Sequence, residues 1–282
     1  MAPSPRPTFD RPTAIPFELA TRHLWGDAAS GEVLDWIYVS SGKIHQLVFG
    51  LGAGGRFAHS DAHRTIFAAD EIYYVLSGTL GLANPETGEV QRVCAGEAAF
   101  FRRDTWHHGF NCGTDALRVL EFFAPPPSTG SSSAYAKTKP NLSSWQYTQD
   151  ALLGQWPMER ERIRRDACFT LIRDTDLLWR MEGREHPALT GLLVATEHLT
   201  VGKLRLLPGQ ATDFETHGGD ESLYVLEGVL TLGVEAAEAS PEYRLKPGDG
   251  FYLPEGTRHR YRNAGEEPAT LLFGVAPQYL AR

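Results

Sequence analysis

Cysteine and long hydrophobic runs are both scarce in this chain. Its three cysteines, Cys94, Cys112 and Cys168, form no CxxC pair and leave an odd number among 282 residues, which excludes a disulfide framework. No apolar run approaches the roughly 20 residues that cross a bilayer. The first residues, MAPSPRPTFDRPTAIPF, are interrupted by proline and contain no apolar signal-peptide core. We therefore expect a soluble, cytoplasmic protein with no membrane partner.

Basic residues are also few. The chain has 27 Lys and Arg against 35 Asp and Glu, which gives a formal net charge of -8, and only the short run MERERIRRD at 158–166 gathers basic side chains. A surface that follows phosphates needs a basic stripe, so nucleic acid is not expected as a partner, nor is a nucleotide cofactor. Hydrophobic residues make up 42% of the chain, enough for two modest cores.

Two segments about 150 residues apart have nearly the same sequence, DEIYYVLSGTLGLANPETGEV at 70–90 and DESLYVLEGVLTLGVEAAEAS at 220–240. The agreement continues where GEAAFFRRDTWHHGFNCG from residue 96 matches GDGFYLPEGTRHRYRNAG from residue 248. Agreement at a fixed offset indicates a duplicated unit. In each unit, short runs of Val, Ile, Leu, Tyr and Phe are broken by Gly, Pro, Asn or Asp, which predicts strands joined by tight turns.

The residues between the two units have a different composition. APPPSTGSSSAYAKTKPNLS at 124–143 is typical of an irregular connector, while SWQYTQDALLGQW and PMERERIRRDA predict two short helices. We therefore predict an all-β protein of two barrels or sandwiches. The predicted divisions are an N-terminal barrel at 1–125, a partly helical linker at 126–176 and a C-terminal barrel at 177–282.

Acidic residues and a histidine crowd the loop before the second copy of the repeat. In a strand, residues two apart point to the same face, so Glu215 and His217 can share one pocket. Gly218 and Gly219 allow a tight reversal, after which Glu221 can point back to the same space. His259, which follows a Pro-Gly turn, is the candidate for a distant ligand. These residues predict a divalent-metal site in the second unit.

The spacing of these residues matches two signature motifs of the cupin superfamily. The motifs are G-x5-(H)-x-H-x3-E-x6-G and G-x5-P-x-G-x2-H-x3-N, and the chain resembles a two-domain bacterial bicupin. The matching residues are Gly209, His217, Glu221, Gly228, Gly248, Pro254, Gly256, His259 and Asn263. The resemblance implies two jelly-roll barrels, with one metal ion held by His217, Glu221 and His259.

Glu215 departs from the motif, which has a histidine at this position. If Glu215 coordinates, two imidazoles and two carboxylates suit Mn(II) or Fe(II). If it does not, the other three ligands form a facial triad with open positions for substrate and dioxygen on Fe(II), and Glu215 is free to carry a proton. A Glu-x-His opening also resembles the metal site of bicupin ureidoglycine aminohydrolases, which are hydrolytic.

The first unit preserves only part of the pattern. Glu71 and His107 stand where Glu221 and His259 do, but the histidines expected before Glu71 are absent. His59 and His63 could reach in from the inserted loop and complete a second metal site with Glu71 and His107. A structural barrel without metal is the alternative. His108 is expected to face away from His107 because neighbouring strand residues alternate.

Several side chains near the second site are candidates for substrate contacts. Arg205 and Arg258 could clamp a carboxylate in bidentate geometry, although each could equally be a surface charge. Tyr224, Tyr252 and Tyr261 lie on predicted strands, where they could line the barrel or pack outside it.

Three functions follow from this pattern. The first is a mononuclear Fe(II) oxygenase of dioxygenase type, acting on a small organic acid or aromatic compound in the C-terminal barrel. The second is an isomerase, lyase or hydrolase of a sugar or ureido acid that uses Mn(II) or Zn(II). The third is a non-catalytic bicupin that binds a small molecule. The exposed sheet faces and edges also suggest a homodimer.

Overall fold

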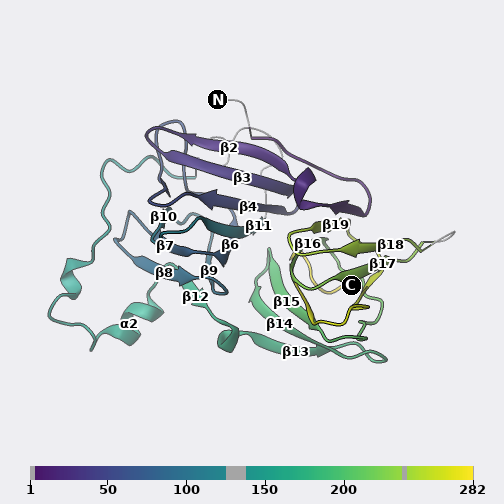
Figure 1. Cartoon of the computed structure of the whole chain (residues 1–282). Coiled ribbons are helices and arrows are strands. Elements are labelled where there is room, and N and C mark those ends of the chain that lie inside the picture. The colour runs from purple at the N-terminus through teal and green to yellow at the C-terminus, as the bar shows by residue number, and fades with distance from the viewer. Residues whose placement is uncertain (1–3, 125–137, 237–239, 282) are drawn as a thin grey trace.

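The computed structural model describes residues 4–124, 138–236 and 240–281, and it consists almost entirely of β-strands arranged in two halves (Figure 1). Each half has a seven-stranded sheet packed on a smaller one, of four strands in the N-terminal half and three in the C-terminal half. The prediction of an all-β chain with two barrels is therefore confirmed. None of the described helices is long and apolar enough to cross a membrane.

The N-terminal barrel is built from ten strands of its own and one that joins from the predicted linker region. They are β2 (Thr21–Asp27), β3 (Gly31–Ser40), β4 (His45–Leu51), β5 (Arg56–Phe57), β6 (Asp70–Ser77), β7 (Thr79–Ala83), β8 (Val90–Cys94), β9 (Ala98–Phe101), β10 (His108–Asn111), β11 (Leu117–Ala124) and β12 (Thr170–Ile172). The larger sheet has the order β12-β9-β6-β11-β4-β3-β2 and the smaller one β5-β10-β7-β8.

The C-terminal barrel repeats this arrangement and takes one strand from the start of the chain. Its strands are β1 (Thr13–Ile15), β13 (Leu178–Glu182), β14 (Ala188–Ala195), β15 (Thr200–Leu206), β16 (Asp220–Glu227), β17 (Leu230–Val234), β18 (Glu242–Leu245), β19 (Gly250–Leu253), β20 (His259–Arg262) and β21 (Ala269–Ala276). The sheet orders are β1-β19-β16-β21-β15-β14-β13 and β18-β17-β20.

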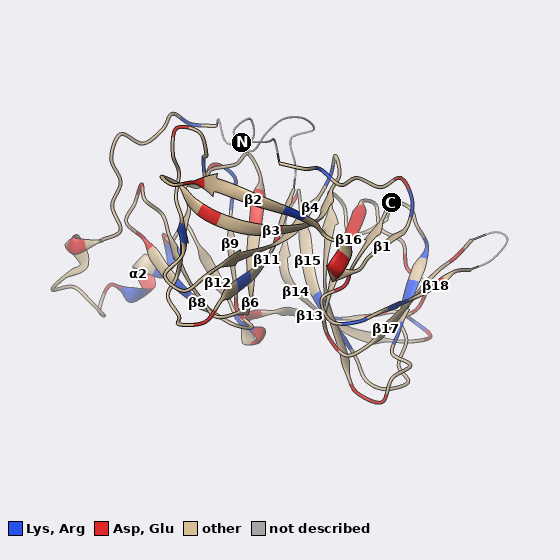
Figure 2. Cartoon of the chain, turned by 45° about the horizontal axis from the view of Figure 1, so that its top comes forward, with Lys and Arg blue, Asp and Glu red and all other residues tan. Residues whose placement is uncertain are grey.

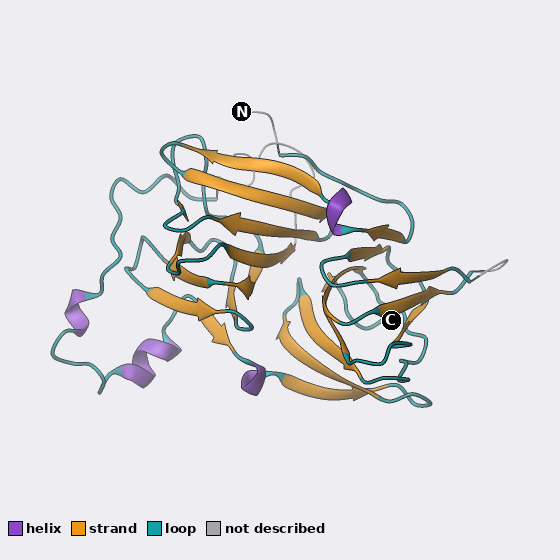
Figure 3. Ribbon diagram, in the orientation of Figure 1, coloured by secondary structure: helices purple, strands orange, loops and turns teal. Residues whose placement is uncertain are grey.

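Helices are few and lie outside the sheets (Figure 3). They are η1 (Phe17–Leu19), η2 (Asp150–Leu152), α2 (Arg160–Arg165) and η3 (Asp174–Asp176). The helix predicted over 144–156 is therefore wrong beyond a single 3-10 turn. Gly154, with a φ of +85°, prevents this turn from continuing toward residue 156. The connector at 125–137 lies outside the described residues. Figure 2 shows Lys and Arg distributed among acidic residues over both halves.

The central strands of the two large sheets, β6, β11, β16 and β21, are buried on both faces, which explains their nearly continuous apolar sequence. Alternate residues of β16 belong to different cores: Leu223 and Val225 pack inside the C-terminal barrel, whereas Tyr224 packs in the core between the barrels. β6 does the same with Tyr73 inside its barrel and Tyr74 in the shared core. The period of two therefore decides which side chains can reach a site inside a barrel.

The two halves also exchange short strands. β1, near the start of the chain, pairs with β19 of the C-terminal barrel, with Thr13 opposite Tyr252. β12, which lies near the end of the predicted linker, pairs with β9 of the N-terminal barrel, with Thr170 opposite Phe100. The strand pairing thus crosses the predicted divisions of the chain: the first residues complete the large sheet of the C-terminal barrel, and the end of the predicted linker completes that of the N-terminal barrel.

A buried carboxylate fastens the interface between the halves. Asp220 accepts hydrogen bonds from the Ser41 hydroxyl at 3.0 Å and the Tyr252 hydroxyl at 2.6 Å, and it forms an ion pair with Lys43 at 2.9 Å. Burial raises the pKa of Asp220, but the hydrogen bonds from Tyr252 and Lys43 outweigh burial and the pKa is lowered. This pairing stabilises the folded state at pH values above the ordinary carboxyl pKa. The stabilisation is lost as the pH falls through the lowered pKa of Asp220 in the folded state.

Replacing Asp220 by alanine is expected to lower the free energy of unfolding by about 3 kcal/mol, because the buried Tyr252 hydroxyl loses its acceptor and Lys43 loses its counter-ion. Denaturant titration at neutral pH measures the loss. Asp174→Ala is the control, since Asp174 pairs with Lys203 at 2.7 Å but is 66% exposed and should cost under about 1 kcal/mol. Equal losses in the two variants would contradict the structural role of Asp220.

Candidate metal centre

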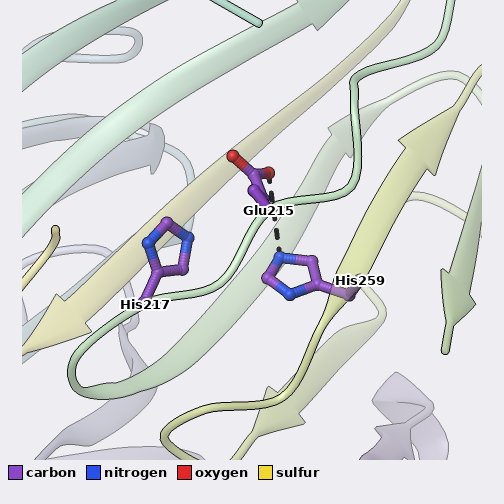
Figure 4. Close-up of side chains that lie close together, drawn as sticks. All are labelled: Glu215, His217 and His259. Carbon is purple, nitrogen blue, oxygen red and sulfur yellow. Dashed lines mark ion pairs between the residues drawn. The ribbon is translucent and has the colours of Figure 1, made fainter. Parts of the chain in front are cut away.

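Two segments that are separate in the sequence, residues 215–221 and the start of β20, meet inside the C-terminal barrel; Figure 4 shows Glu215, His217 and His259 from them. Glu215 forms an isolated bridge with His259, the first residue of β20, through the hydrogen bonds Glu215 N to His259 O at 2.8 Å and His259 N to Glu215 O at 3.0 Å. His217 follows two residues after Glu215, and Glu221 is the second residue of β16. Backbone hydrogen bonds therefore hold Glu215 and His259 next to each other, independently of their side chains.

The donor atoms of these side chains converge. Glu221 Oε2 lies 3.0 Å from His259 Nε2 and 3.4 Å from His217 Nε2, and Glu215 Oε1 lies 3.7 Å from His259 Nε2. Glu221 and His259 are each 1% exposed. Despite their proximity, Glu221 Oε2 and His259 Nε2 form no hydrogen bond of acceptable geometry. Buried polar atoms are rarely left without a partner, and these two point at a common space that suits a cation.

Both imidazoles are held with Nε2 facing the site. His217 Nδ1 lies 2.7 Å from the Tyr279 carbonyl oxygen, and His259 Nδ1 lies 3.1 Å from that of Thr257. A carbonyl can only accept, so each Nδ1 carries the proton and donates it. When the imidazole is neutral, each Nε2 has a free lone pair, which is the arrangement that metal-ligating histidines require. The donor set of two imidazoles and two carboxylates fits a divalent ion such as Mn(II) or Fe(II).

Charge within the site is balanced by a proton. Burial alone would lower the pKa of His259, but Glu221 and Glu215 raise it to about 9. Burial would raise the pKa of Glu221, yet His259 and His217 lower it. Burial raises the pKa of Glu215 to about 8, against the opposing effect of His259. A divalent ion would displace the proton on His259, so its binding is expected to weaken as the pH falls.

Tyr261 holds the Glu221 carboxylate in place, because its hydroxyl donates to Glu221 Oε1 at 2.6 Å. This bond leaves Oε2 as the oxygen that faces the imidazoles. Partners of this kind fix the orientation of a ligand.

Tyr261→Phe is expected to weaken binding of Mn(II) by roughly 10- to 100-fold, because Glu221 loses the bond that orients it. The ring remains, so the fold should be retained. Metal titration followed by calorimetry measures the affinity. Tyr243→Phe is the matched control, since Tyr243 packs on Phe251 at 4.8 Å between ring centroids and lies outside the site. Unchanged affinity in Tyr261→Phe would exclude the supporting role.

A cavity of about 340 Å³ opens beside the donor atoms. Glu215, His217 and Glu221 line it, together with an aromatic wall and polar groups at its rim. The wall and rim include Phe214, Tyr261, Phe273, Tyr279, Glu182 and Arg184. Tyr279, which was not predicted from the sequence, stacks on His217 at 4.7 Å and donates its hydroxyl to Glu182 at 2.7 Å. Tyr279 follows the last strand, where no repeat or motif marks it.

Of the five predicted substrate contacts, Tyr261 alone lines this cavity. Tyr224 and Tyr252 lie on the opposite sheet face, where Tyr224 packs on Tyr38 at 5.7 Å and Tyr252 binds Asp220. Arg205 is exposed on β15. The prediction that these three side chains contact substrate is therefore wrong. Side chains along a strand alternate between the inside and the outside of the barrel, and these three point outside.

Arg258 also lies outside the cavity. It pairs with Glu235 at 2.7 Å through both carboxylate oxygens and stands over the Phe214 ring at 5.0 Å. Arg258 therefore supports the back of the aromatic wall, and its guanidinium group is already paired with a carboxylate of the protein.

The four residues predicted to form a second metal site do not gather in one place. Glu71 and His107 face each other at 3.8 Å, but His59 Nδ1 pairs with His108 Nε2 at 2.7 Å and His63 Nδ1 pairs with Asp27 at 3.2 Å. Within the described residues, the one group of three or more possible ligands close enough to share an ion is Glu215, His217 and His259. His59 and His63 in the inserted loop therefore bind His108 and Asp27, and they do not join Glu71 and His107 in a second metal site.

Comparison with known protein families identifies the repeat. A cupin domain is matched twice, at residues 47–123 and 202–275, which together span more than half of the chain. The chain belongs to the cupin family. The resemblance seen in the motifs is thus confirmed, and both halves of this cupin carry the domain.

Related proteins of known sequence match only part of this cupin. It is 30% identical over 99 residues to the tetracenomycin polyketide synthase protein TcmJ of Streptomyces glaucescens, covering 35% of this chain and 64% of that protein. It is 36% identical over 90 residues to germin-like protein 1 of Brassica napus, covering 31% of this chain and 41% of that protein. The match thus spans less than two thirds of either relative.

Solved structures match the whole bicupin arrangement at low identity. AerE from Microcystis aeruginosa superimposes with a TM-score of 0.60 at 11% identity, covering 91% of this chain and 97% of that one. Oxalate decarboxylase from Bacillus subtilis superimposes with a TM-score of 0.63 at 13% identity, covering 98% and 79%. These similarities establish a shared fold of two cupin barrels.

Proposed function

We propose that this cupin is a divalent-metal-dependent enzyme that converts a small organic acid in its C-terminal barrel. The observation that carries this proposal is the convergence of Glu215, His217, Glu221 and His259 beside a cavity of about 340 Å³. His217, Glu221 and His259 would hold the ion, with Glu215 within reach as a fourth ligand. When bound, the ion would supply Lewis-acid polarisation of a substrate oxygen.

Glu215 is the proposed proton carrier. It lines the cavity, and its pKa of about 8 lets it exchange a proton near neutral pH. Phe214, Phe273 and Tyr279 supply flat apolar walls, which suit an aromatic or otherwise planar acid. Arg184, at the rim of the same cavity, is positioned to attract a carboxylate.

The position of Glu215 favours a reaction without dioxygen, such as that of a lyase, isomerase or hydrolase, with Mn(II) or Zn(II) as the ion. A fourth protein ligand leaves fewer open positions than a facial triad does. Structurally similar oxalate decarboxylase from Bacillus subtilis contains Mn(II) centres; it shares only the fold with this chain, so oxalate is not assigned as the substrate.

An Fe(II) oxygenase is the second candidate. Glu221 lies at 3.0 Å and 3.4 Å from the two imidazole nitrogens, whereas the Glu215 oxygen is 3.7 Å from His259 Nε2. A triad of His217, Glu221 and His259 with Glu215 standing off is consistent with these distances.

Metal reconstitution separates the two candidates. Protein purified without added ions is analysed for metal, then loaded anaerobically with Mn(II) or Fe(II) and supplied with aliphatic and aromatic carboxylic acids. We expect turnover without oxygen uptake. Oxygen consumption matched to product, with Fe(II) only, would favour the oxygenase. Ligand binding without turnover, unaffected by removal of metal, would support a non-catalytic binding protein.

A further inference from the structure

The interior of the N-terminal barrel contains three carboxyl groups that the proposed function does not use. Asp35 on β3, Glu71 on β6 and Glu121 on β11 are 7%, 1% and 7% exposed, and acidic positions on β3 are visible in Figure 2. Burial, followed by the neighbouring Glu121 charge, raises the pKa of Asp35. Burial also raises the pKa of Glu121 to about 8. Buried carboxyl groups of this kind stay protonated at neutral pH unless a cation stabilises their ionised form.

The barrel fold itself does not require these acids. Glu121 is the fifth residue of β11, and the fifth residue of the equivalent strand β21 is Phe273. Asp35 stands opposite Phe49 in the sheet, and the corresponding pair in the other half is Thr190 opposite Leu204. An apolar ring and a hydroxyl therefore fill the same positions in the C-terminal barrel.

Asp35 and Glu121 line a cavity of about 100 Å³ whose other walls are mainly aromatic. The aromatic side chains are Trp25, Phe49, Phe57, Phe67, Tyr73 and Phe123. Within the described residues, no hydrogen bond reaches the Asp35 carboxyl group, and Glu71 Oε2 is likewise without a partner. The cavity thus presents an unpartnered buried carboxyl group to whatever occupies it.

The protein supplies no cation for this cluster. In the part of the chain that is described, no lysine or arginine side chain forms an ion pair with Asp35, Glu71 or Glu121, and none contributes to their pKa values. His107 lies 3.8 Å from Glu71, and burial lowers its pKa to about 4. A neutral imidazole does not stabilise the ionised form of these acids.

The shape of the cavity favours an organic cation over a metal ion. The only group of three metal-ligating side chains within mutual reach in the described residues is in the other barrel. Aromatic faces attract a cation through their negative quadrupole, and they form the usual cage for alkylammonium groups. The cavity is smaller than the roughly 150 Å³ that accommodates benzene, which limits the ligand to a few non-hydrogen atoms.

We propose that the N-terminal barrel binds a small alkylammonium cation in this cavity, with Asp35 and Glu121 as counter-ions and the aromatic side chains as walls. This site is separate from the metal centre of the C-terminal barrel and does not depend on the function proposed for it. The N-terminal barrel, which preserves only part of the metal-site motif, would then bind a ligand of its own.

Calorimetric titration of the full chain with methylammonium, trimethylammonium and tetramethylammonium chloride, at ionic strength matched with sodium chloride, tests the proposal. We expect saturable binding of at least one of these ions with a stoichiometry of one. Asp35→Asn and Glu121→Gln should each weaken it by at least about tenfold, because a charge-assisted contact is lost. Glu32→Gln is the matched control, since Glu32 is exposed on the same strand and should leave the affinity unchanged.

The neutral variants preserve side-chain shape and remove buried charge, so thermal unfolding should show them folded. Absence of binding by all three ions at millimolar concentration would overturn the proposal, as would equal affinity in the wild type and the Asp35→Asn, Glu121→Gln double variant. Binding of a second Mn(II) per chain that is lost in Glu71→Gln would also overturn it, by assigning the acids to a metal.

Discussion

Replacing His259 by alanine is expected to reduce the affinity of the C-terminal barrel for Mn(II) or Fe(II) by about 100-fold or more. The imidazole is 1% exposed, its Nε2 is 3.0 Å from Glu221 Oε2, and loss of even an outer partner of a ligand typically costs 10- to 100-fold. His217→Ala should have a similar effect. Metal content after dialysis against a defined free-metal buffer measures both.

His198→Ala is a suitable control for these variants. His198 is partly exposed next to Glu197, with 3.7 Å between the ion-pairing atoms, and it lies outside the centre. Circular dichroism should show that all three variants retain the β-sheet signal. If His259→Ala and His217→Ala bound metal as the wild type does, the assignment of the centre would be wrong.

Glu215→Gln is expected to lower turnover by about 10²- to 10⁴-fold, the range that proton transfer by a positioned side chain contributes. The amide keeps the size of the side chain and its backbone bridge to His259, but it cannot carry a proton. Under the proposed role, metal content should remain within a few-fold of the wild type, because His217, Glu221 and His259 still converge.

The two possible roles of Glu215 give different results in the same experiment. Loss of metal together with activity would make Glu215 mainly a ligand. Retained metal with wild-type activity over the pH range 6–9 would contradict both roles. Glu182→Gln provides the comparison, because Glu182 lines the same cavity and accepts from Tyr279 without facing the imidazole nitrogens.

Local pattern was sufficient to predict the barrels and the approach of the main donors. The repeat around β6 and β16 is visible as alternating apolar residues. The spacing of His217, Glu221 and His259 follows from the alternation of side chains along a strand and from the turn before β16. Both patterns lie within short stretches of sequence. The same alternation shows in hindsight that Tyr224 and Tyr252 face away from the site, because each is an odd number of residues from an inward-facing neighbour.

Features that depend on long-range contacts were not predictable. Nothing in the sequence near Tyr279 marks it as the residue that stacks on His217, and the direction of the inserted loop with His59 and His63 is decided by Trp106, His108 and Asp27. The three-residue strands β1 and β12 are too short to show a period. Tertiary pairing alone makes them strands.

Because β1 and β12 each pair with a sheet of the other barrel, the stability of each half depends on the other. A chain severed between β11 and β12 would yield two fragments, each still inserted in its counterpart's sheet, and these should migrate together until denatured. Either fragment produced alone would expose an open hydrogen-bonding edge at β9 or β19. We therefore expect the duplicated cupin units to behave as one assembly and not as two separable domains.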